Sequence, residues 1–454
     1  MLVPLLALVS LYVVSSSFDV GRTAPMSLAD AYSVIKEYIQ EYSGLSPAGA
    51  YCELNHDKCC TIAESKSGCS LGDFADDVTS IVYTGGETTC IFGDKYNFQV
   101  VKGDSDKLLF YFQGGGACWD KLSTDTSLCT TTTSPQPLEG LFDRSDSKDN
   151  EYKDFTIVHV SYCSGDLHAG NITRSYTSLL GKPVVQSGQA NTMAVLDWVK
   201  SQQARGSLSP TLSKIVVSGC SAGSIGAQIW GSYILDNLKW ATAAVMPDSY
   251  IGVFPKNSQG PLIESFGMCG AAFLSANMQA ECRQKKLTLQ QIANFFMKEK
   301  TNVPFAYIQS KIDSTQQAFY VAIGLTEYPS LDEPFLITPS QFYDDVNEIM
   351  SFYNERENFI TYLVDGTQHC FTPKTLYYTA DSYGPADSGA NDGTNPMLFS
   401  WANNLPLQSG EAQETVCQGD VTKSNGLASA GDSFVMLADN TYCSDDVVPK
   451  TFTA

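Results

Sequence analysis

Basic residues are scarce in this sequence. Lysine and arginine together number 28, against 49 aspartate and glutamate residues, which gives a net charge of −21. A surface with this excess of negative charge repels nucleic acid and anionic membranes, so neither is an expected partner. The sequence also lacks a P-loop, a dinucleotide-binding glycine pattern and a His-Glu-x-x-His pair. These motifs bind nucleotides or catalytic zinc, and we therefore expect no cofactor and no metal.

Long apolar runs are missing as well. The apolar segment Leu2–Val14 is too short to span a bilayer, and no later segment is long and apolar enough to do so. Three serines, Ser15 to Ser17, follow the segment and suit cleavage by signal peptidase. We therefore expect residues 1–17 to be a signal peptide, and the protein to be secreted into the extracellular space or the cell wall.

Cysteine, in contrast, is plentiful. The 14 cysteines all follow the apolar segment, and an even number in an oxidising compartment favours up to seven disulfides. Four of them, between Tyr51 and Ser70, suggest a small disulfide-stapled unit; zinc binding with His56 is the alternative, but no C-x-x-C pair supports it. Asn171, in Asn-Ile-Thr, is a candidate site of N-glycosylation.

The most informative stretch is Lys214–Gly226. Ile215, Val216 and Val217 predict a short buried strand, and an apolar helical pattern starts directly after Gly223. Between them lies Gly-Cys-Ser-Ala-Gly, in which Ser221 is the central residue. A G-x-S-x-G sequence between a strand and a helix is typical of a nucleophile elbow, which exposes the serine hydroxyl at the carboxyl edge of a sheet.

The surrounding segments predict a mostly parallel sheet flanked by helices, that is, the α/β-hydrolase fold. Apolar strands alternate with helical patterns along the chain. The strands are expected near 97–102, 107–113, 155–161, 241–246, 303–309 and 359–364, the helices near 28–42, 190–203 and 341–353, and a polar surface loop at 130–150. We divide the chain into an N-terminal helix with a Cys-rich segment (18–95), a hydrolase domain (96–404) with a cap insertion at 249–300, and a C-terminal tail (405–454). The N-terminal segment and the C-terminal tail are both expected to be disulfide-rich. In the tail, Cys417 and Cys443 are the cysteines that would form the disulfide.

A serine nucleophile needs a base, and histidine has a pKa near working pH. The sequence has only four histidines. His159 lies within the alternation of a predicted strand and fits a core position. His369, after the last predicted strand, is the one histidine that follows Ser221, as the Ser, Asp, His order of the fold requires. His168 also follows a strand and is the rival candidate.

Three aspartates could orient the base. Asp313 follows the penultimate predicted strand, which is the usual position of the acid in this fold. Asp248 follows the strand after the elbow, and Asp365 lies four residues before His369. Strand order favours Asp313.

The glycine loop Gly114–Gly116 follows another predicted strand. Its backbone amides at Gly115 and Gly116, with that of Ala222, would hold the oxyanion formed when the serine attacks. Trp119, just after the loop, either lines the substrate pocket or fills the core.

These pieces together resemble the pectin acetylesterase family, which includes the Notum-like carboxylesterases. The resemblance spans roughly residues 97–417, and the segment Tyr162–Gly170 (Tyr-Cys-Ser-Gly-Asp-Leu-His-Ala-Gly) is its most specific part. The other matching segments are Gly114–Trp119, Gly219–Gly223, Gln309–Gln316 and Asp365–His369. The resemblance implies a secreted, metal-free α/β-hydrolase with Ser221, Asp313 and His369 as catalytic residues, and it implies that Asp166 and His168 support the site.

We therefore expect a monomeric serine carboxylesterase that removes acyl groups, in particular acetyl groups, from a polysaccharide such as pectin. Two other functions are compatible with the same residues. One is a Notum-like deacylase of longer acyl chains, and the other is a non-catalytic carbohydrate-binding relative.

Overall fold

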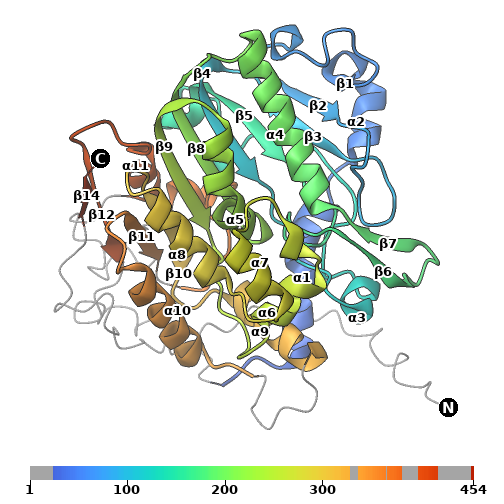
Figure 1. Ribbon diagram of the computed structural model, residues 1–454, viewed down its shortest axis with the longest axis vertical. Helices are drawn as coiled ribbons and strands as arrows, with labels where there is room; N and C mark the ends of the chain where they lie inside the picture. The colour runs from blue at the N-terminus through green and yellow to red at the C-terminus, as the bar shows by residue number, and fades with distance from the viewer. Residues whose placement is uncertain (1–23, 328–335, 365, 381–396, 418–450, 454) are drawn as a thin grey trace.

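The computed structural model describes residues 24–327, 336–364, 366–380, 397–417 and 451–453. Its centre is a ten-stranded sheet with the order β1-β2-β3-β5-β4-β8-β9-β10-β11-β13 (Figure 1). Every neighbouring pair is parallel except the two pairs formed by β3. The sheet strands are β1 (Cys59–Thr61), β2 (Thr79–Tyr83), β3 (Asn97–Val101), β4 (Asp104–Phe112), β5 (Phe155–Val160), β8 (Leu212–Cys220), β9 (Trp240–Asp248), β10 (Phe305–Ser310), β11 (Phe359–Val364) and β13 (Val416–Cys417). The predicted α/β-hydrolase fold with a mostly parallel sheet is therefore confirmed.

Helices cover both faces of this sheet. In Figure 1, α4, α5 and α8 are drawn in front of the strands, whereas α1 lies behind α7 and packs against α9. The helices are α1 (Leu28–Ser43), α2 (Ala48–Leu54), α3 (Lys121–Asp125), α4 (Gly188–Arg205), α5 (Ala222–Asn237), α6 (Gln259–Ser265), α7 (Ala276–Arg283), α8 (Leu289–Glu299), α9 (Ser314–Glu327), α10 (Pro339–Tyr353) and α11 (Leu398–Asn403). Side chains at several helix starts, including Ser27, Thr288 and Thr338, accept hydrogen bonds from free backbone amides and so set where these helices begin.

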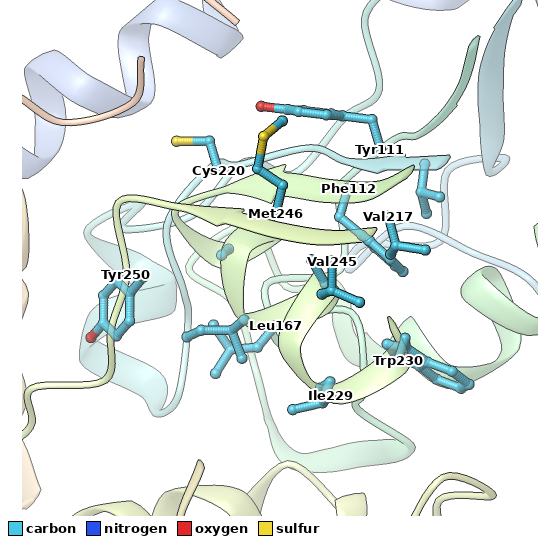
Figure 2. Close-up of a cluster of buried hydrophobic side chains, with 14 of the residues drawn as sticks. Tyr111, Phe112, Leu167, Val217, Cys220, Ile229, Trp230, Val245, Met246 and Tyr250 are labelled. Atoms are coloured by element: carbon cyan, nitrogen blue, oxygen red, sulfur yellow. The ribbon is translucent and has the colours of Figure 1, made fainter. Parts of the chain in front are cut away.

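The core follows from strands that are apolar on both faces. Figure 2 shows Phe112, Val217 and Val245 on the side of the sheet that faces helix α5. Tyr111 and Met246, each next to one of those residues in sequence, lie on the other side. Burial of both faces is what a central parallel sheet requires, and it explains why these strands read as continuous apolar runs in the sequence.

The sheet extends further than predicted at both ends. On one side, β1 and β2 join it, so the boundary that we propose at residue 96 does not interrupt the sheet. On the other side, β13 pairs with β11, which was expected to be the last strand. Two small pairs lie outside the sheet: β6 (Ile172–Thr177) with β7 (Pro183–Gln186), and β12 (Ala412–Glu414) with β14 (Thr451–Thr453).

The predicted surface loop at 130–150 is partly wrong. Leu141 and Phe142 form a short 3-10 turn with Gly140 and are completely or almost completely buried. Phe142 packs edge-on against Tyr111 of β4, with 4.7 Å between the ring centroids. Most of the residues around Leu141 and Phe142 are polar, so the composition of this segment did not indicate that these two residues are buried.

Six disulfides stabilise the described chain. They join Cys52 to Cys59, Cys60 to Cys69, Cys90 to Cys163, Cys118 to Cys129, Cys220 to Cys370 and Cys269 to Cys282. The first two confirm the predicted N-terminal stapled unit and leave no thiolate there for zinc. Residues 1–17 and Cys443 lie outside the described residues, so the signal peptide and the disulfide of the tail stay predictions. None of the described helices has the length and apolar character needed to cross a membrane.

Candidate active site

Ser221 lies at a strained turn between β8 and α5. Its backbone has φ 58° and ψ −120°, a region that residues with side chains rarely adopt. The turn needs glycine on both sides: a Cβ atom on Gly219 or Gly223 would collide with the carbonyl oxygen of Phe112 on the neighbouring strand. Ser221 is 2% exposed. The predicted elbow therefore forms, and β4 and β8 approach each other closely beside it.

His369 and Asp313 pair with each other near this turn, to which the Cys220–Cys370 disulfide ties the histidine loop. The imidazole Nδ1 of His369 donates to a carboxylate oxygen of Asp313 over 2.7 Å, and both side chains are buried. Asp313 also accepts from the backbone amide and the side-chain amide of Gln316, in the first turn of α9. Because Nδ1 carries the proton, Nε2 is left as an acceptor; it is buried and has no hydrogen-bond partner among the described residues.

Asp248, the second candidate for the catalytic acid, binds the loop after His369 rather than the imidazole. One of its oxygens accepts from the amides of Phe371 and Thr372 and from the Thr372 hydroxyl, at 2.7–2.8 Å. Its other oxygen accepts from Ser249. Asp248 therefore anchors the loop that follows His369. The third candidate, Asp365, lies outside the described residues.

A disulfide links the elbow directly to the histidine loop. It joins Cys220, the residue before Ser221, to Cys370, the residue after His369. Both sulfur atoms lie within 4.8 Å of an imidazole nitrogen of His369, and this trio is the one candidate metal group found in the described part of the chain. Because the sulfurs are bonded to each other, the trio offers no thiolate ligand.

The glycine loop, Gly114–Gly116, lies next to the elbow. The backbone amides of Gly115 and Gly116 in this loop have different surroundings. Gly116 and Ala222 line the same cavity as Ser221. The amide of Gly115 instead donates to the hydroxyl of Tyr38 on α1, over 3.1 Å. Gly115 and Gly116 have φ values of 136° and 73°, so glycine is needed at both positions.

The cavity beside Ser221 is small and apolar. Its volume is about 30 Å³, and a cavity needs roughly 10–15 Å³ to hold one water molecule. Trp119, 2% exposed, contributes to the wall, as does Phe319 of α9, whose ring meets the indole edge-on. The complete lining is Gly116, Ala117, Trp119, Leu167, Ser221, Ala222, Ile225, Tyr250, Phe254, Leu262, Phe266, Phe319 and Ile323. Trp119 thus faces the cavity, although it is also part of the core.

Asp166 and His168 lie behind the site. Asp166 is fully buried and accepts from Ser164 Oγ and from the amide of Gly188, the first residue of α4. Burial raises the pKa of this carboxyl to about 6. His168 Nε2 donates to the carbonyl of Gln113, directly before the glycine loop, and burial lowers the pKa of its imidazole to about 4. Neither side chain touches the cavity.

A profile of the family described as Pectinacetylesterase matches residues 81–379. The chain belongs to the pectinacetylesterase family. This family consists of carboxylesterases. Among solved structures, the Wnt deacylase Notum from Drosophila is similar to this chain, with 16% identity over 64% of this chain and 85% of that one, and a TM-score of 0.47. A comparison with curated proteins finds no match.

Tyr38, on α1, contributes to this site but was not among the predicted site residues. Tyr38 reaches the glycine loop from α1, and its ring also meets the His369 imidazole edge-on, at 4.8 Å between centroids. Tyr38 lies in the helix predicted near residues 28–42. No local pattern indicated what it would contact, because its partners lie about 80 and 330 residues further along the chain.

Of the remaining predicted positions, Asn171 is exposed directly before β6, and its side chain is therefore accessible for glycosylation. His56 lies in the N-terminal unit, on the short turn before β1. His159 is confirmed as a core histidine of β5: it is 3% exposed and its ring stacks on Tyr111 at 5.3 Å.

The burial of His159 predicts a pH-dependent stability. Burial, and to a smaller degree the proximity of His168, lowers the pKa of its imidazole to about 3. In the unfolded chain a histidine takes up a proton near pH 6.5, so the folded state loses stability as the pH falls from 6.5 towards 3.

The variant His159→Phe lacks this loss of stability. Its unfolding free energy relative to wild type should therefore rise by about 1.4 kcal/mol for each pH unit lowered in this window. Urea denaturation between pH 4 and 7 measures the difference; a constant difference would contradict it.

Proposed function

We propose that this protein is a secreted serine carboxylesterase that removes O-acetyl groups from a polysaccharide such as pectin. The observation that carries the proposal is the short hydrogen bond between His369 and Asp313, formed beside a serine on a strained elbow. A buried imidazole with its Nδ1 proton held by a carboxylate and its Nε2 unoccupied is suited to take a proton from a neighbouring hydroxyl. Membership of a carboxylesterase family supports the same chemistry.

In the proposed reaction, Ser221 Oγ attacks the carbonyl carbon of the ester while its proton passes to His369 Nε2. The bond to the sugar oxygen then breaks, and His369 returns the proton to that oxygen. This leaves an acetyl group on Ser221 and a free sugar hydroxyl. A water molecule next attacks the acetyl carbon while His369 takes one of its protons. The bond between that carbon and Ser221 Oγ then breaks, His369 returns the proton to Oγ, and acetate leaves with Ser221 restored. Asp313 keeps the imidazole oriented and stabilises it while it is charged.

Two amides are best placed to stabilise the oxyanion. Those of Gly116 and Ala222 belong to the residues that line the cavity with Ser221. Losing one such donor typically costs about 3 kcal/mol of transition-state stabilisation. The amide of Gly115 is bound to Tyr38, so we assign it to holding the loop in place rather than to direct contact with the oxyanion. By the same reasoning, His168 supports the loop through Gln113, and Asp166 supports it less directly through α4.

The size of the cavity favours a short acyl group. A volume of about 30 Å³ accommodates the methyl group of acetate, whereas a long acyl chain would need the wall to move. Leu262 and Phe266 contribute to this wall from and just after α6. We therefore propose that the part of segment 249–300 around α6 acts as the cap. The strongly acidic composition supports the expectation that neither nucleic acid nor an anionic membrane is a partner.

Acyl-chain selectivity tests this proposal. Wild type should release acetate from acetylated pectin, and its kcat/KM for p-nitrophenyl esters should fall steadily from acetate to octanoate. Phe319→Ala should enlarge the cavity and shift the optimum to butyrate or longer, since each methylene that becomes buried is worth about 0.8 kcal/mol, or fourfold in kcat/KM. Phe352→Ala, on the partly exposed face of α10, is the matched control and should leave the profile unchanged.

Other outcomes point to the other functions. A wild-type profile that peaks above butyrate would favour the longer-chain deacylase. Binding of pectin without hydrolysis of any ester would favour the non-catalytic relative.

A further inference from the structure

Helix α1 lies outside the region that matches the family, which begins at residue 81. It nevertheless covers the glycine loop. Its buried face consists of Ala31, Ile35, Tyr38, Ile39 and Tyr42. A Cβ atom on Gly116 would meet the side chain of Ile39, and one on Gly114 would meet the hydroxyls of Tyr38 and Tyr42. The loop is therefore glycine-rich partly because this helix packs against it.

Tyr38 contacts three parts of the proposed catalytic machinery. Its hydroxyl oxygen accepts from the Gly115 amide over 3.1 Å. Its ring meets the imidazole of His369 at an interplanar angle of 83°. Its hydroxyl also interacts with the Ser221 side chain, a contact that partly opposes the rise in the Tyr38 pKa. Tyr38 is 4% exposed, so these contacts are made away from bulk water.

The hydrogen bonds have a definite direction. Tyr38 donates its own proton to the hydroxyl of Tyr42, at 3.3 Å, and its oxygen accepts from the Gly115 amide. Burial, together with the neighbouring Tyr42, raises the pKa of Tyr38 well above 10. The phenol therefore stays neutral and does not act as a base. Its contribution is geometric.

We propose that Tyr38 is a positioning residue, which holds the glycine loop, the Ser221 hydroxyl and the His369 ring in their reactive arrangement from a helix outside the family region. This inference rests on the proposed function. By fixing the Gly115 amide, Tyr38 keeps the next amide, that of Gly116, directed into the cavity. By packing against the imidazole, it limits rotation of the ring about the Asp313 hydrogen bond. The proton of Ser221 still passes to His369.

Two matched substitutions test the proposal, because each removes a single hydroxyl and keeps the ring. Tyr38→Phe leaves the buried Gly115 amide without its acceptor, and should lower kcat for p-nitrophenyl acetate about 10- to 100-fold with KM changed less than about threefold. The labelling of Ser221 by a fluorophosphonate probe should slow by a similar factor. Tyr42→Phe removes only the group that accepts from Tyr38 and should change both rates less than about threefold. Rates are expressed per folded molecule, determined by thermal melting, so that a loss of folding is not counted as a loss of positioning.

The controls separate this inference from the proposed function. If wild type labels and hydrolyses esters but Tyr38→Phe is equally fast or faster, the positioning role is wrong while the esterase proposal stands. Equal slowing by Tyr42→Phe would also overturn the role, because it would point to packing of the tyrosine pair. A wild type that neither labels nor hydrolyses would overturn both proposals.

Discussion

Ser221→Ala is expected to lower kcat for p-nitrophenyl acetate by roughly 10⁶-fold, the loss seen when the nucleophile of a serine hydrolase is removed. The substitution deletes the single oxygen that attacks the ester. Alanine should tolerate the elbow as well as serine does, since φ 58° penalises any Cβ-bearing residue to a similar degree. The variant should thus remain folded, with a melting temperature within a few degrees of wild type, while activity and probe labelling are lost.

Ser218→Ala is the matched control for this prediction. Ser218 lies on the same strand, is completely buried, and donates its hydroxyl to the carbonyl of Met246 at 2.6 Å. Removing that hydroxyl should cost about 1 kcal/mol of stability and leave kcat nearly unchanged. If Ser221→Ala keeps more than a small fraction of the wild-type rate, the nucleophile has been assigned to the wrong residue.

The elbow could be predicted from sequence because its determinants are local. A β-branched run, two glycines around a serine and a helical pattern occupy thirteen consecutive residues, and the structure shows that both glycines are needed by the close approach of Phe112. The pairing of His369 with Asp313 depended on strand order, which is a property of the whole fold. Asp248 ends β9 and Asp313 follows the neighbouring strand β10, so both lie at the same edge of the sheet, and the order of the strands favoured Asp313.

Other features required the three-dimensional structure. The pairing of Cys220 with Cys370 spans 150 residues, and no spacing rule assigns it. A helical pattern predicted the helix near residues 28–42, but such a pattern cannot show that its buried face lies over the glycine loop. The amide of Gly115 was for that reason expected to face the oxyanion, whereas its partner is Tyr38. In each case the deciding contact joins segments that are distant in the chain.

Asp313→Asn is expected to lower kcat about 10⁴-fold. The carboxylate accepts the Nδ1 proton of His369 and thereby leaves Nε2 free to take the serine proton. An amide presents an N–H group on one side, which favours the opposite tautomer, with the proton on Nε2. That imidazole has no lone pair directed at Ser221. The side chain is of the same size, and its remaining oxygen can still accept from the Gln316 backbone amide, whereas the side-chain amide of Gln316 loses its acceptor. The loss should therefore appear in kcat with little change in KM and with a modestly lower melting temperature.

Asp248→Asn provides the comparison, because it makes the same chemical change in a second buried aspartate of the same region. Asp248 binds Phe371, Thr372 and Ser249 rather than the imidazole. Its amide variant can keep an oxygen towards the loop and turn its N–H group towards the Ser249 hydroxyl. We therefore expect a loss in kcat of less than about tenfold, together with a lower melting temperature, since a buried network with charged character is weakened. Steady-state kinetics of the two variants on the same ester show which aspartate orients His369 and which one anchors its loop. Equal losses in kcat would mean that Asp313 has no special relation to His369. A larger loss in Asp248→Asn would assign the role of the acid to Asp248.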